Sequence, residues 1–469
     1  MLGMQALAAA AGTLDVVTLP AGDHPGSRDR VYAVYSPTRA ATPAPLLMAL
    51  HGCRQTHEDV LRDWGLVAAA DRHGFVLVVP HVTSYVEARN RGCWGFWLDQ
   101  HRHQGRGEVE DLHRIARHVE SRLAIDPARR YVVGLSSGGA MAVAAAVAHN
   151  EYWAAVASAA GLPYGEDAAA VSLSGRCPGT ASFHAVRQVV ADMHGEIDHP
   201  YPVPLLVLQG ANDCTVLPEA ATRLRDAHLA AFAPPSGGAG SAGAATPVSR
   251  RPCAHVHEAG FGCEHARHTI DGTASGHTLV ETVVFDGPRA TADPTDTDHG
   301  HYWVSGPHGR DGPWTQRRGP VFPEIAWAFF DRHPRRAGLE SAIAAPRCTR
   351  LTATLLSHWG AGRVVRGGMT GARALAEADR ADLGPLWNAG ARVTLRAGAR
   401  RRAAPADPRE AVGREGLSAA PRPAPPPAAR QRSPLATRRA ARGARDPRTK
   451  PPGAGRSPGA LPARPSGSR

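Results

Sequence analysis

The sequence contains very little lysine, few cysteines and no long apolar run. Of its 469 residues, 54 are basic, and Lys450 is the single lysine among them. No run of about 18 apolar residues occurs, so we expect no transmembrane helix. The apolar N-terminus lacks the basic stretch of a signal peptide and is a poor match to one. Seven cysteines are too few for a disulfide scaffold, although they permit up to three bridges in an oxidising compartment.

The positive charge of the chain is concentrated at its C-terminal end. Residues 1–349 carry 30 basic and 35 acidic side chains, whereas residues 350–469 carry 24 and 7. The formal net charge of +12 therefore comes from the last quarter of the chain. Because the field of the N-terminal part is slightly negative, we expect no nucleic-acid binding there.

The C-terminal segment 346–469 is rich in arginine, alanine and proline. From about residue 400 it has too few apolar side chains to offset the entropy of ordering, which predicts a disordered, low-complexity tail. Scattered apolar residues within 351–396 allow one marginal helix. Two other interpretations stay open: a basic arm that binds nucleic acid or an anionic surface, and translation of a GC-rich gene in the wrong frame. We expect the folded domain to comprise residues 1–345.

Residues 1–345 alternate between short apolar runs and amphipathic stretches. Buried apolar strands that alternate with helices predict an α/β fold, with a mostly parallel sheet covered by helices on both faces. The segment Pro234 to Val248 is Gly/Ala/Ser-rich and reads as a surface insertion. The expected strands are 31–35, 46–50, 75–80, 131–135, 155–160, 204–210 and 280–285, and the expected helices are 60–71, 109–123 and 325–333.

The most informative motif is Gly134-Leu135-Ser136-Ser137-Gly138, which follows an apolar strand and precedes an alanine-rich run. A serine between two glycines can occupy a strained strand-to-helix turn that exposes its hydroxyl at the edge of a sheet. The motif predicts Ser136 as a nucleophile. The alternative is a glycine-rich turn in which the serine only caps the helix.

A serine nucleophile needs a base, an acid that orients the base, and two N–H donors for the oxyanion. Asp213 follows the strand 204–210 and is the expected acid, although aspartate is also common in ordinary turns. His299 and His301 follow the last predicted strand and are the candidate bases. We expect the N–H groups of Cys53 and Ser137 to form the oxyanion hole.

Six short motifs follow one another along residues 51–303: His51–Gln55, Cys93–Trp97, Gly107-Glu108, Gly134–Met141, Gln209–Val216 and Gly300–Trp303. Together they resemble the polyhydroxybutyrate (PHB) depolymerase family of esterases, which have an α/β-hydrolase fold. The family also includes feruloyl and acetylxylan esterases. Its GHxW histidine loop is similar to Gly300–Trp303 and favours His301 over His299. At Gln209 the sequence departs from the family, in which histidine is usual.

The resemblance implies a serine carboxylic-ester hydrolase that cleaves hydroxyalkanoate polymers or oligomers through an acyl-serine intermediate. Alternatives are a feruloyl or acetylxylan esterase, or an inactive hydrolase-fold protein that binds through its basic tail. Trp94, Trp97 and Trp303 are expected to contact substrate, with core packing as their alternative. We expect no cofactor and no metal. The family implies an extracellular or periplasmic protein, and the weak N-terminal signal leaves the cytoplasm open.

The segment from Cys253 to His268 clusters cysteine and histidine without the spacing of a standard zinc finger. A zinc site, a Cys253–Cys263 disulfide, and solvent-exposed side chains are its three interpretations. Cys53 and Cys93 are a second candidate pair, since both are expected near the rim of the active site.

Overall fold

The computed structural model describes residues 12–335 except 84, 86, 90, 173–176, 233–246, 259, 270–276 and 287–299. Beyond residue 335 it describes the backbone of short strands between 349 and 397. By contact density the chain divides into Met1–Arg402 and Ala403–Arg469, and the second unit lies outside the described residues. Among the described helices, none has the length and apolar character needed to cross a bilayer.

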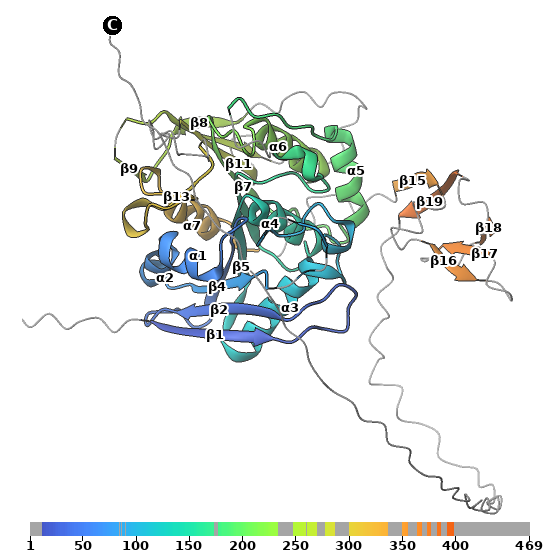
Figure 1. Cartoon of the computed structure of the whole chain (residues 1–469), viewed down its shortest axis with the longest axis horizontal. Helices are drawn as coiled ribbons and strands as arrows, with labels where there is room; N and C mark the ends of the chain where they lie inside the picture. The colour runs from blue at the N-terminus through green and yellow to red at the C-terminus, as the bar shows by residue number, and fades with distance from the viewer. Residues whose placement is uncertain are drawn as a thin grey trace, which may run out of the picture. The chain divides into compact units, whose positions relative to one another are not determined.

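A sheet of ten strands runs through the described part of the chain (Figure 1). Its order is β1-β2-β4-β3-β5-β6-β7-β11-β10-β8. The six neighbouring strands β4, β3, β5, β6, β7 and β11 in the middle of this order run parallel to one another. The pairs at both ends of the sheet are antiparallel. The strands are β1 (Thr13–Leu19), β2 (Arg30–Ser36), β3 (Ala44–Leu50), β4 (Val76–His81), β5 (Ile125–Leu135), β6 (Ala155–Ala159), β7 (Leu205–Gly210), β8 (Ser249–Pro252), β10 (Cys263–Thr269) and β11 (Thr278–Phe285).

The helices form two groups. Helix α2 packs against α7, whereas α3, α4, α5 and α6 contact one another in series, and α4 and α7 both pack on β5 and β6 (Figure 1). The ring of Phe330 in α7 stacks on Tyr131 of β5 at 4.7 Å. The bounds are α1 (His57–Asp63), α2 (Leu66–His73), α3 (Gly107–Arg122), α4 (Ser137–Ala148), α5 (Val186–Glu196), α6 (Glu219–Phe232) and α7 (Phe322–Arg332).

The central strands are apolar on both faces, and that explains their parallel arrangement. Every residue of β3, β6 and β7 is buried, as is required of strands covered by helices on both sides. Helix α4 is buried over all its twelve residues and consists largely of alanine and glycine, so it can pack closely against the sheet. The predicted α/β fold, with a mostly parallel sheet covered by helices, is confirmed.

Several elements differ from the sequence-based expectation. The helix expected over 60–71 is two helices, because Gly65 between them has a left-handed backbone with φ of +72°. The segment with clustered cysteine and histidine contains β10, an antiparallel strand that extends the sheet. Most of the Gly/Ala/Ser-rich insertion lies outside the described residues. Strand β1 and helices α5 and α6 had no strong sequence signal.

The C-terminal part of the described chain contains strands where one marginal helix was expected. β15 (Thr349–Thr354) pairs with β19 (Arg392–Ala397), and β17 (Arg373–Ala376) pairs with both β16 (Val364–Gly367) and β18 (Asp382–Pro385). These strands pair among themselves and not with the ten-stranded sheet. Where these strands lie, the marginal helix that the sequence allowed is not formed, and the domain boundary at 345 stays a prediction.

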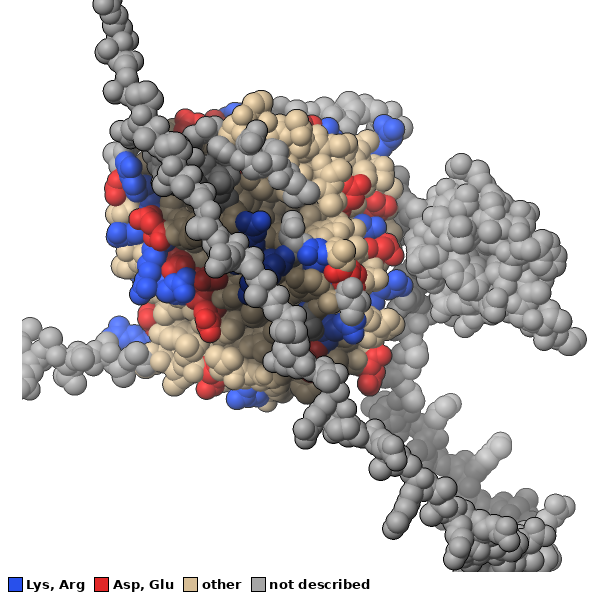
Figure 2. All heavy atoms as spheres, in the orientation of Figure 1, with Lys and Arg blue, Asp and Glu red and all other residues tan. Residues whose placement is uncertain are grey.

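The surface of the described domain carries charges of both signs. In Figure 2, acidic and basic side chains are interspersed over the visible face. This mixed surface agrees with the nearly balanced composition of residues 1–349.

Candidate active site

Ser136 occupies the sharp turn between β5 and α4. Its φ of 58° and ψ of −122° fall in a region that side chains rarely adopt. The turn is held on both sides, because the Ser136 N–H donates to Ala159 O at 2.8 Å and the Ala140 N–H donates to Ser136 O at 2.9 Å. Ser136 is only half-buried, in contrast to its neighbours. The backbone therefore presents the hydroxyl in the way that a nucleophile requires.

The glycines around Ser136 are required by close packing. A Cβ added to Gly138 would lie 2.2 Å from Leu50 O and 2.4 Å from His51 O, and one added to Gly134 would lie 2.2 Å from Gly138 O. The start of α4 is thus pressed against the end of β3. This contact brings the loop after β3 to the nucleophile.

Asp213 and His301 are paired at the same edge of the sheet. The Nδ1 of His301 lies 2.7 Å from Asp213 Oδ2, and both side chains are buried. The other carboxylate oxygen accepts the N–H groups of Thr215 at 2.8 Å and Val216 at 2.9 Å. Asp213 is therefore fixed from three directions and can orient one imidazole nitrogen. The other candidate base, His299, lies outside the described residues.

The loops that carry the acid and the base pack on each other. Gly300 has a φ of +91°, and a Cβ there would lie 2.7 Å from Asn212 O, so only glycine fits beside the aspartate loop. Gln209, where the resembling family usually has histidine, donates through Nε2 to Gly210 O at 3.1 Å and Val216 O at 3.0 Å. The buried glutamine amide therefore stabilises the loop that carries Asp213 by holding two of its carbonyl groups.

The loop after β3 lies against the nucleophile, as expected for an oxyanion loop. A Cβ added to Gly52 would lie 3.5 Å from Ser136 Cβ. Within the described part of the chain, no hydrogen bond is formed by the N–H of Cys53 or Ser137. The Ser137 N–H is at the first position of α4, where helical N–H groups have no partner within the helix. Neither N–H group is therefore occupied by a partner within the described residues.

His51 orients this loop, a role that the motif His51–Gln55 did not by itself indicate. It is fully buried, and burial lowers its pKa to about 4, so the ring is neutral at pH 7. Its Nε2 accepts the Val82 N–H at 3.2 Å, and its Nδ1 then carries the proton and donates to Gly52 O at 2.8 Å. Gln55 Oε1 accepts the Gly52 N–H at 2.9 Å. The peptide groups on both sides of Gly52 are therefore held by side chains.

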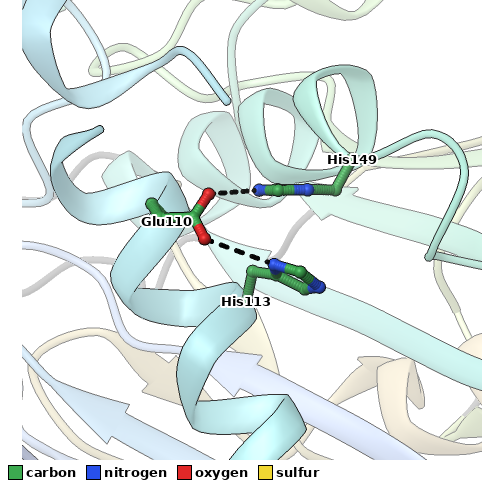
Figure 3. Close-up of side chains that lie close together, drawn as sticks. All are labelled: Glu110, His113 and His149. Carbon is green, nitrogen blue, oxygen red and sulfur yellow. Dashed lines mark hydrogen bonds and ion pairs between the residues drawn. The ribbon is translucent and has the colours of Figure 1, made fainter. Parts of the chain in front are cut away.

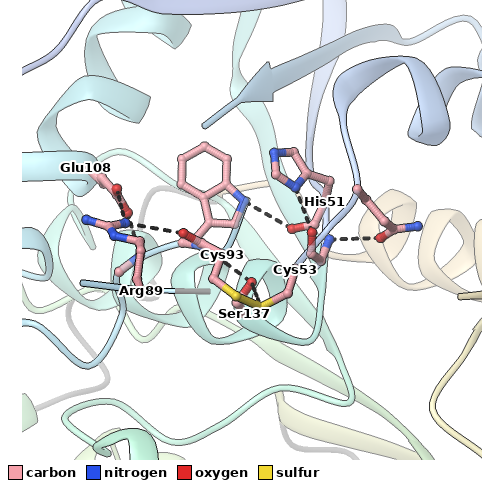
Figure 4. The surroundings of a disulfide bond; sticks show 10 residues. His51, Cys53, Arg89, Cys93, Glu108 and Ser137 are labelled. Carbon is pink, nitrogen blue, oxygen red and sulfur yellow. Dashed lines mark hydrogen bonds and ion pairs between the residues drawn. A yellow bond between two sulfur atoms is a disulfide. The ribbon is translucent and has the colours of Figure 1, made fainter. Parts of the chain in front are cut away.

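A disulfide joins the loop after β3 (the oxyanion loop) to the segment Cys93–Trp97, which we call the aromatic segment (Figure 4). Cys53 is bonded to Cys93, and the Cys53 Sγ lies 3.4 Å from Ser137 Oγ. Ser137 Oγ also accepts the Trp94 N–H at 3.3 Å, and the Trp94 indole N–H donates to His51 O at 3.0 Å. The two loops and the start of α4 thus form one connected unit beside Ser136.

A buried ion pair between Arg89 and Glu108 holds the backbone of the aromatic segment (Figure 4). Arg89 donates to Glu108 Oε1 at 2.6 Å and to Cys93 O at 3.2 Å, while Glu108 Oε2 accepts the Gly95 N–H at 2.6 Å. Burial alone would raise the pKa of Glu108, but the nearby cations, Arg30 foremost, hold it below its usual value. Glu108 is therefore ionised, and its role is to fix the backbone of Cys93 and Gly95.

Two of the three expected substrate contacts lie in the core. Trp94 and Trp303 have no exposed surface, and Trp303 stacks on Trp64 at 4.1 Å while its indole N–H donates to Trp64 O at 2.9 Å. The expectation that these two touch substrate is corrected, since core packing uses their whole surface. Trp97 is half-buried and keeps a surface for a ligand.

Trp314 is an aromatic neighbour of the histidine that the sequence did not indicate. It is half-buried, and its ring lies 6.4 Å from that of His301 in an edge arrangement. Its carbonyl accepts the Trp303 N–H at 2.9 Å in the pairing of β12 (Trp303–Val304) with β13 (Thr315–Gln316). The one sequence feature that could have indicated Trp314 is its position in a loop before the closing helix.

The cysteine-rich segment forms a disulfide. Cys253 bonds Cys263, so neither thiol is available to zinc, and His265 is buried with its Nε2 2.7 Å from Glu281 Oε2. Of the three interpretations, the disulfide is the one formed. A further bridge, Cys177–Cys214, was not foreseen and ties the residue after Asp213 to a distant loop.

Comparison with known proteins agrees with these motifs. Residues 30–246 match the family model described as Esterase PHB depolymerase, a range that contains Ser136 and Asp213 and ends before His301. Poly(3-hydroxyalkanoate) depolymerase C of Paucimonas lemoignei is 31% identical over 30% of this chain and 33% of its own. Feruloyl esterase B of Neurospora crassa is 28% identical over 37% and 58%.

The chain therefore spans less than two thirds of the length of these curated relatives. Among solved structures, an acetyl xylan esterase from Aspergillus awamori overlays with a TM-score of 0.45 at 15% identity. That overlay covers 68% of this chain and 99% of the other.

Proposed function

We propose that this chain is a serine esterase of the PHB depolymerase family, since residues 30–246 match the model of that family. Ser136 is the nucleophile, His301 the general base and Asp213 the residue that orients it. The catalytic unit lies within residues 1–345. The observation that carries the proposal is the 2.7 Å contact of Asp213 with His301, combined with the strained backbone of Ser136.

The reaction proceeds by two acyl transfers. His301 takes the proton of the Ser136 hydroxyl as the oxygen attacks the ester carbonyl, and the N–H groups of Cys53 and Ser137 stabilise the negative oxygen. His301 then returns the proton to the leaving alcohol, and the acyl group stays on Ser136. His301 then takes a proton from water as the water oxygen attacks this acyl-serine, and it returns that proton to the Ser136 oxygen as the acyl–oxygen bond breaks and the acid leaves. Asp213 keeps the imidazole in the tautomer that both steps need.

Substitution of the serine tests the reaction class. Wild-type protein should hydrolyse p-nitrophenyl butyrate, and Ser136→Ala should lower kcat by roughly 10³-fold or more, since loss of the nucleophile disables the whole triad. Ser121→Ala is the matched control, because Ser121 is an exposed serine on α3 that bonds only His118 O within the described residues. Equal rates in wild type and Ser136→Ala would end the serine-esterase assignment.

Covalent trapping tests the intermediate separately. Phenylmethanesulfonyl fluoride should add one sulfonyl group to the peptide that contains Ser136, and mass spectrometry should locate it. Labelling of Ser136→Ala to the same extent would show that another residue is the nucleophile.

We propose short soluble hydroxyalkanoate esters as substrates. The relative from P. lemoignei is named a poly(3-hydroxyalkanoate) depolymerase, and the half-buried rings of Trp97 and Trp314 offer apolar surface for an acyl chain. A panel of 3-hydroxybutyrate oligomers, methyl ferulate and acetylated xylan decides the class. A higher kcat/KM for methyl ferulate would instead favour the activity for which the N. crassa relative is named.

An oxidising compartment fits the disulfides. The described residues contain three bridges, and such bridges persist outside the reducing cytosol. We therefore propose that the protein works in the extracellular space or the periplasm.

A further inference from the structure

A group of metal-ligating side chains lies outside the active site, between α3 and the end of α4 (Figure 3). Glu110 and His113 are three residues apart on α3 and therefore share one face of that helix. His149 directly follows α4, the helix that begins directly after Ser136. One ligand atom from each of the three residues lies within 4.8 Å of the other two.

The distances among these atoms match the dimensions of a metal site. His113 Nδ1 lies 3.5 Å from Glu110 Oε1, and His149 Nε2 lies 3.1 Å from Glu110 Oε2. In a tetrahedral site with metal–ligand bonds of about 2.0–2.1 Å, neighbouring ligand atoms are about 3.4 Å apart. Both imidazole–carboxylate distances are close to this value, and one ligand atom of each residue lies within 4.8 Å of the other two.

The second nitrogen of His149 has the partner that metal-bound histidines usually have. His149 Nδ1 lies 3.1 Å from Glu151 Oε1, which also accepts from Gln104 Nε2 at 3.3 Å. A carboxylate that accepts from one imidazole nitrogen fixes the ring and directs the lone pair of the other nitrogen toward the metal. The ligand Glu110 is fixed as well, because its Oε2 accepts the Gly105 N–H at 2.8 Å.

The surroundings hold the site in shape and favour positive charge. The rings of His113 and His149 lie 4.1 Å apart, and Tyr152 contacts His113 edge-on at 4.8 Å. His149 is almost fully buried, whereas Glu110 and His113 keep partial exposure through which an ion can enter. Two carboxylates and the negative end of the α4 dipole face this point, so a divalent cation is electrostatically favoured.

We propose that Glu110, His113 and His149 bind a zinc ion that fastens α3 to the end of α4. Two imidazoles and one carboxylate are a zinc ligand set, with water as the fourth ligand. Nitrogen ligands select zinc over magnesium and calcium, which prefer oxygen. The ion has a structural role here, since His149 lies at the opposite end of α4 from Ser136 and the other two ligands are on α3.

Zinc binding by the purified full-length protein tests the proposal. After dialysis against EDTA, titration with ZnCl₂ should show one ion per chain by calorimetry, and zinc should raise the midpoint of thermal unfolding. MgCl₂ should produce neither effect. Co²⁺ in place of zinc should give the visible absorption of a tetrahedral site.

Two variants make the test specific. His113→Ala removes a partly exposed ligand and should weaken zinc binding at least tenfold, and Glu110→Gln should do the same while it keeps the shape of the side chain. His103→Ala is the matched control. His103 also contacts two carboxylates, Asp99 at 2.9 Å and Glu196 at 2.8 Å, but it is not one of the three proposed zinc ligands. It should bind zinc as wild type does.

The outcomes separate a zinc site from an ion pair and from the proposed esterase activity. Absence of stoichiometric zinc, or equal binding by wild type and His113→Ala, would show that Glu110 and His149 form only an ion pair and would overturn the proposal. Ser136→Ala should bind zinc normally, so the zinc result is independent of whether the protein proves to be an esterase.

Discussion

Substitutions at His51 would show how a side chain that touches no substrate sets up the oxyanion hole. The neutral ring donates to Gly52 O and accepts from the Val82 N–H. Because the peptide between Gly52 and Cys53 is planar and trans, its carbonyl and its N–H point in opposite directions. Fixing the carbonyl toward His51 therefore directs the Cys53 N–H away from it, on the side where we expect the oxyanion.

The two hydrogen bonds of His51 can be removed one at a time. His51→Asn places an amide N–H near the position of Nδ1, so it keeps the bond to Gly52 O and leaves the Val82 N–H unsatisfied. The stability loss should be about 1–3 kcal/mol, the cost of one buried unsatisfied donor. His51→Gln places an amide oxygen near Nε2, so it keeps the Val82 bond and removes the His51 bond to Gly52 O, which then keeps only the weaker bond from the Gln55 N–H at 3.2 Å.

His51→Gln should therefore lower kcat by roughly 10²-fold, because removal of one oxyanion donor costs about 10²–10³-fold in related chemistry. KM should change little. The measurements are kcat and KM with p-nitrophenyl butyrate, and the free energy of unfolding in urea. A kcat for His51→Gln within about threefold of wild type, or a larger kcat loss in His51→Asn than in His51→Gln, would refute the assigned role.

Three further outcomes follow from the structure. Asp213→Asn should lower kcat about 10⁴-fold through the wrong imidazole tautomer, with an unchanged thermal midpoint, and a loss below tenfold would contradict the triad. Gly138→Ala should destabilise the fold by at least about 1–3 kcal/mol, since its Cβ would meet two carbonyls of the β3 end; a urea midpoint equal to wild type would contradict this packing. Burial lowers the pKa of both His51 and His228 from an ordinary 6.5 to about 4, so between these pH values the unfolded chain binds more protons than the folded one. The free energy of unfolding should therefore fall as the pH drops from about 6.5 to 4. Urea midpoints that stay constant over this pH range would contradict the expected loss.

The parts of the molecule that local sequence determines were predictable. Ser136 was identifiable because the glycines, the preceding strand and the following helix are contiguous in the chain. Asp213 followed from its place after a strand of six buried residues, and the α/β fold followed from the alternation of such strands with helices. Their roles in catalysis stay predictions until the variants are measured.

Features that depend on distant partners were not predictable from the sequence alone. Trp94 and Trp303 looked like ligand contacts, and only the packed structure shows that other aromatic and backbone groups cover them. The Cys177–Cys214 bridge joins residues 37 positions apart. His149 is brought to Glu110 by the packing of α4 on α3. In each case the partner is set by tertiary structure, which no local pattern encodes.

The Cys53–Cys93 bridge has a practical consequence for anyone who produces this protein. The ten-stranded sheet is built from apolar strands and does not depend on that bridge for its core. We therefore expect protein made in a reducing bacterial cytosol to be soluble and folded by circular dichroism, yet to turn over slowly, because its oxyanion loop is not tied to the aromatic segment. Export to the periplasm, or refolding with oxidised glutathione, should restore the rate, so the yield of active enzyme and the yield of folded enzyme are separate quantities.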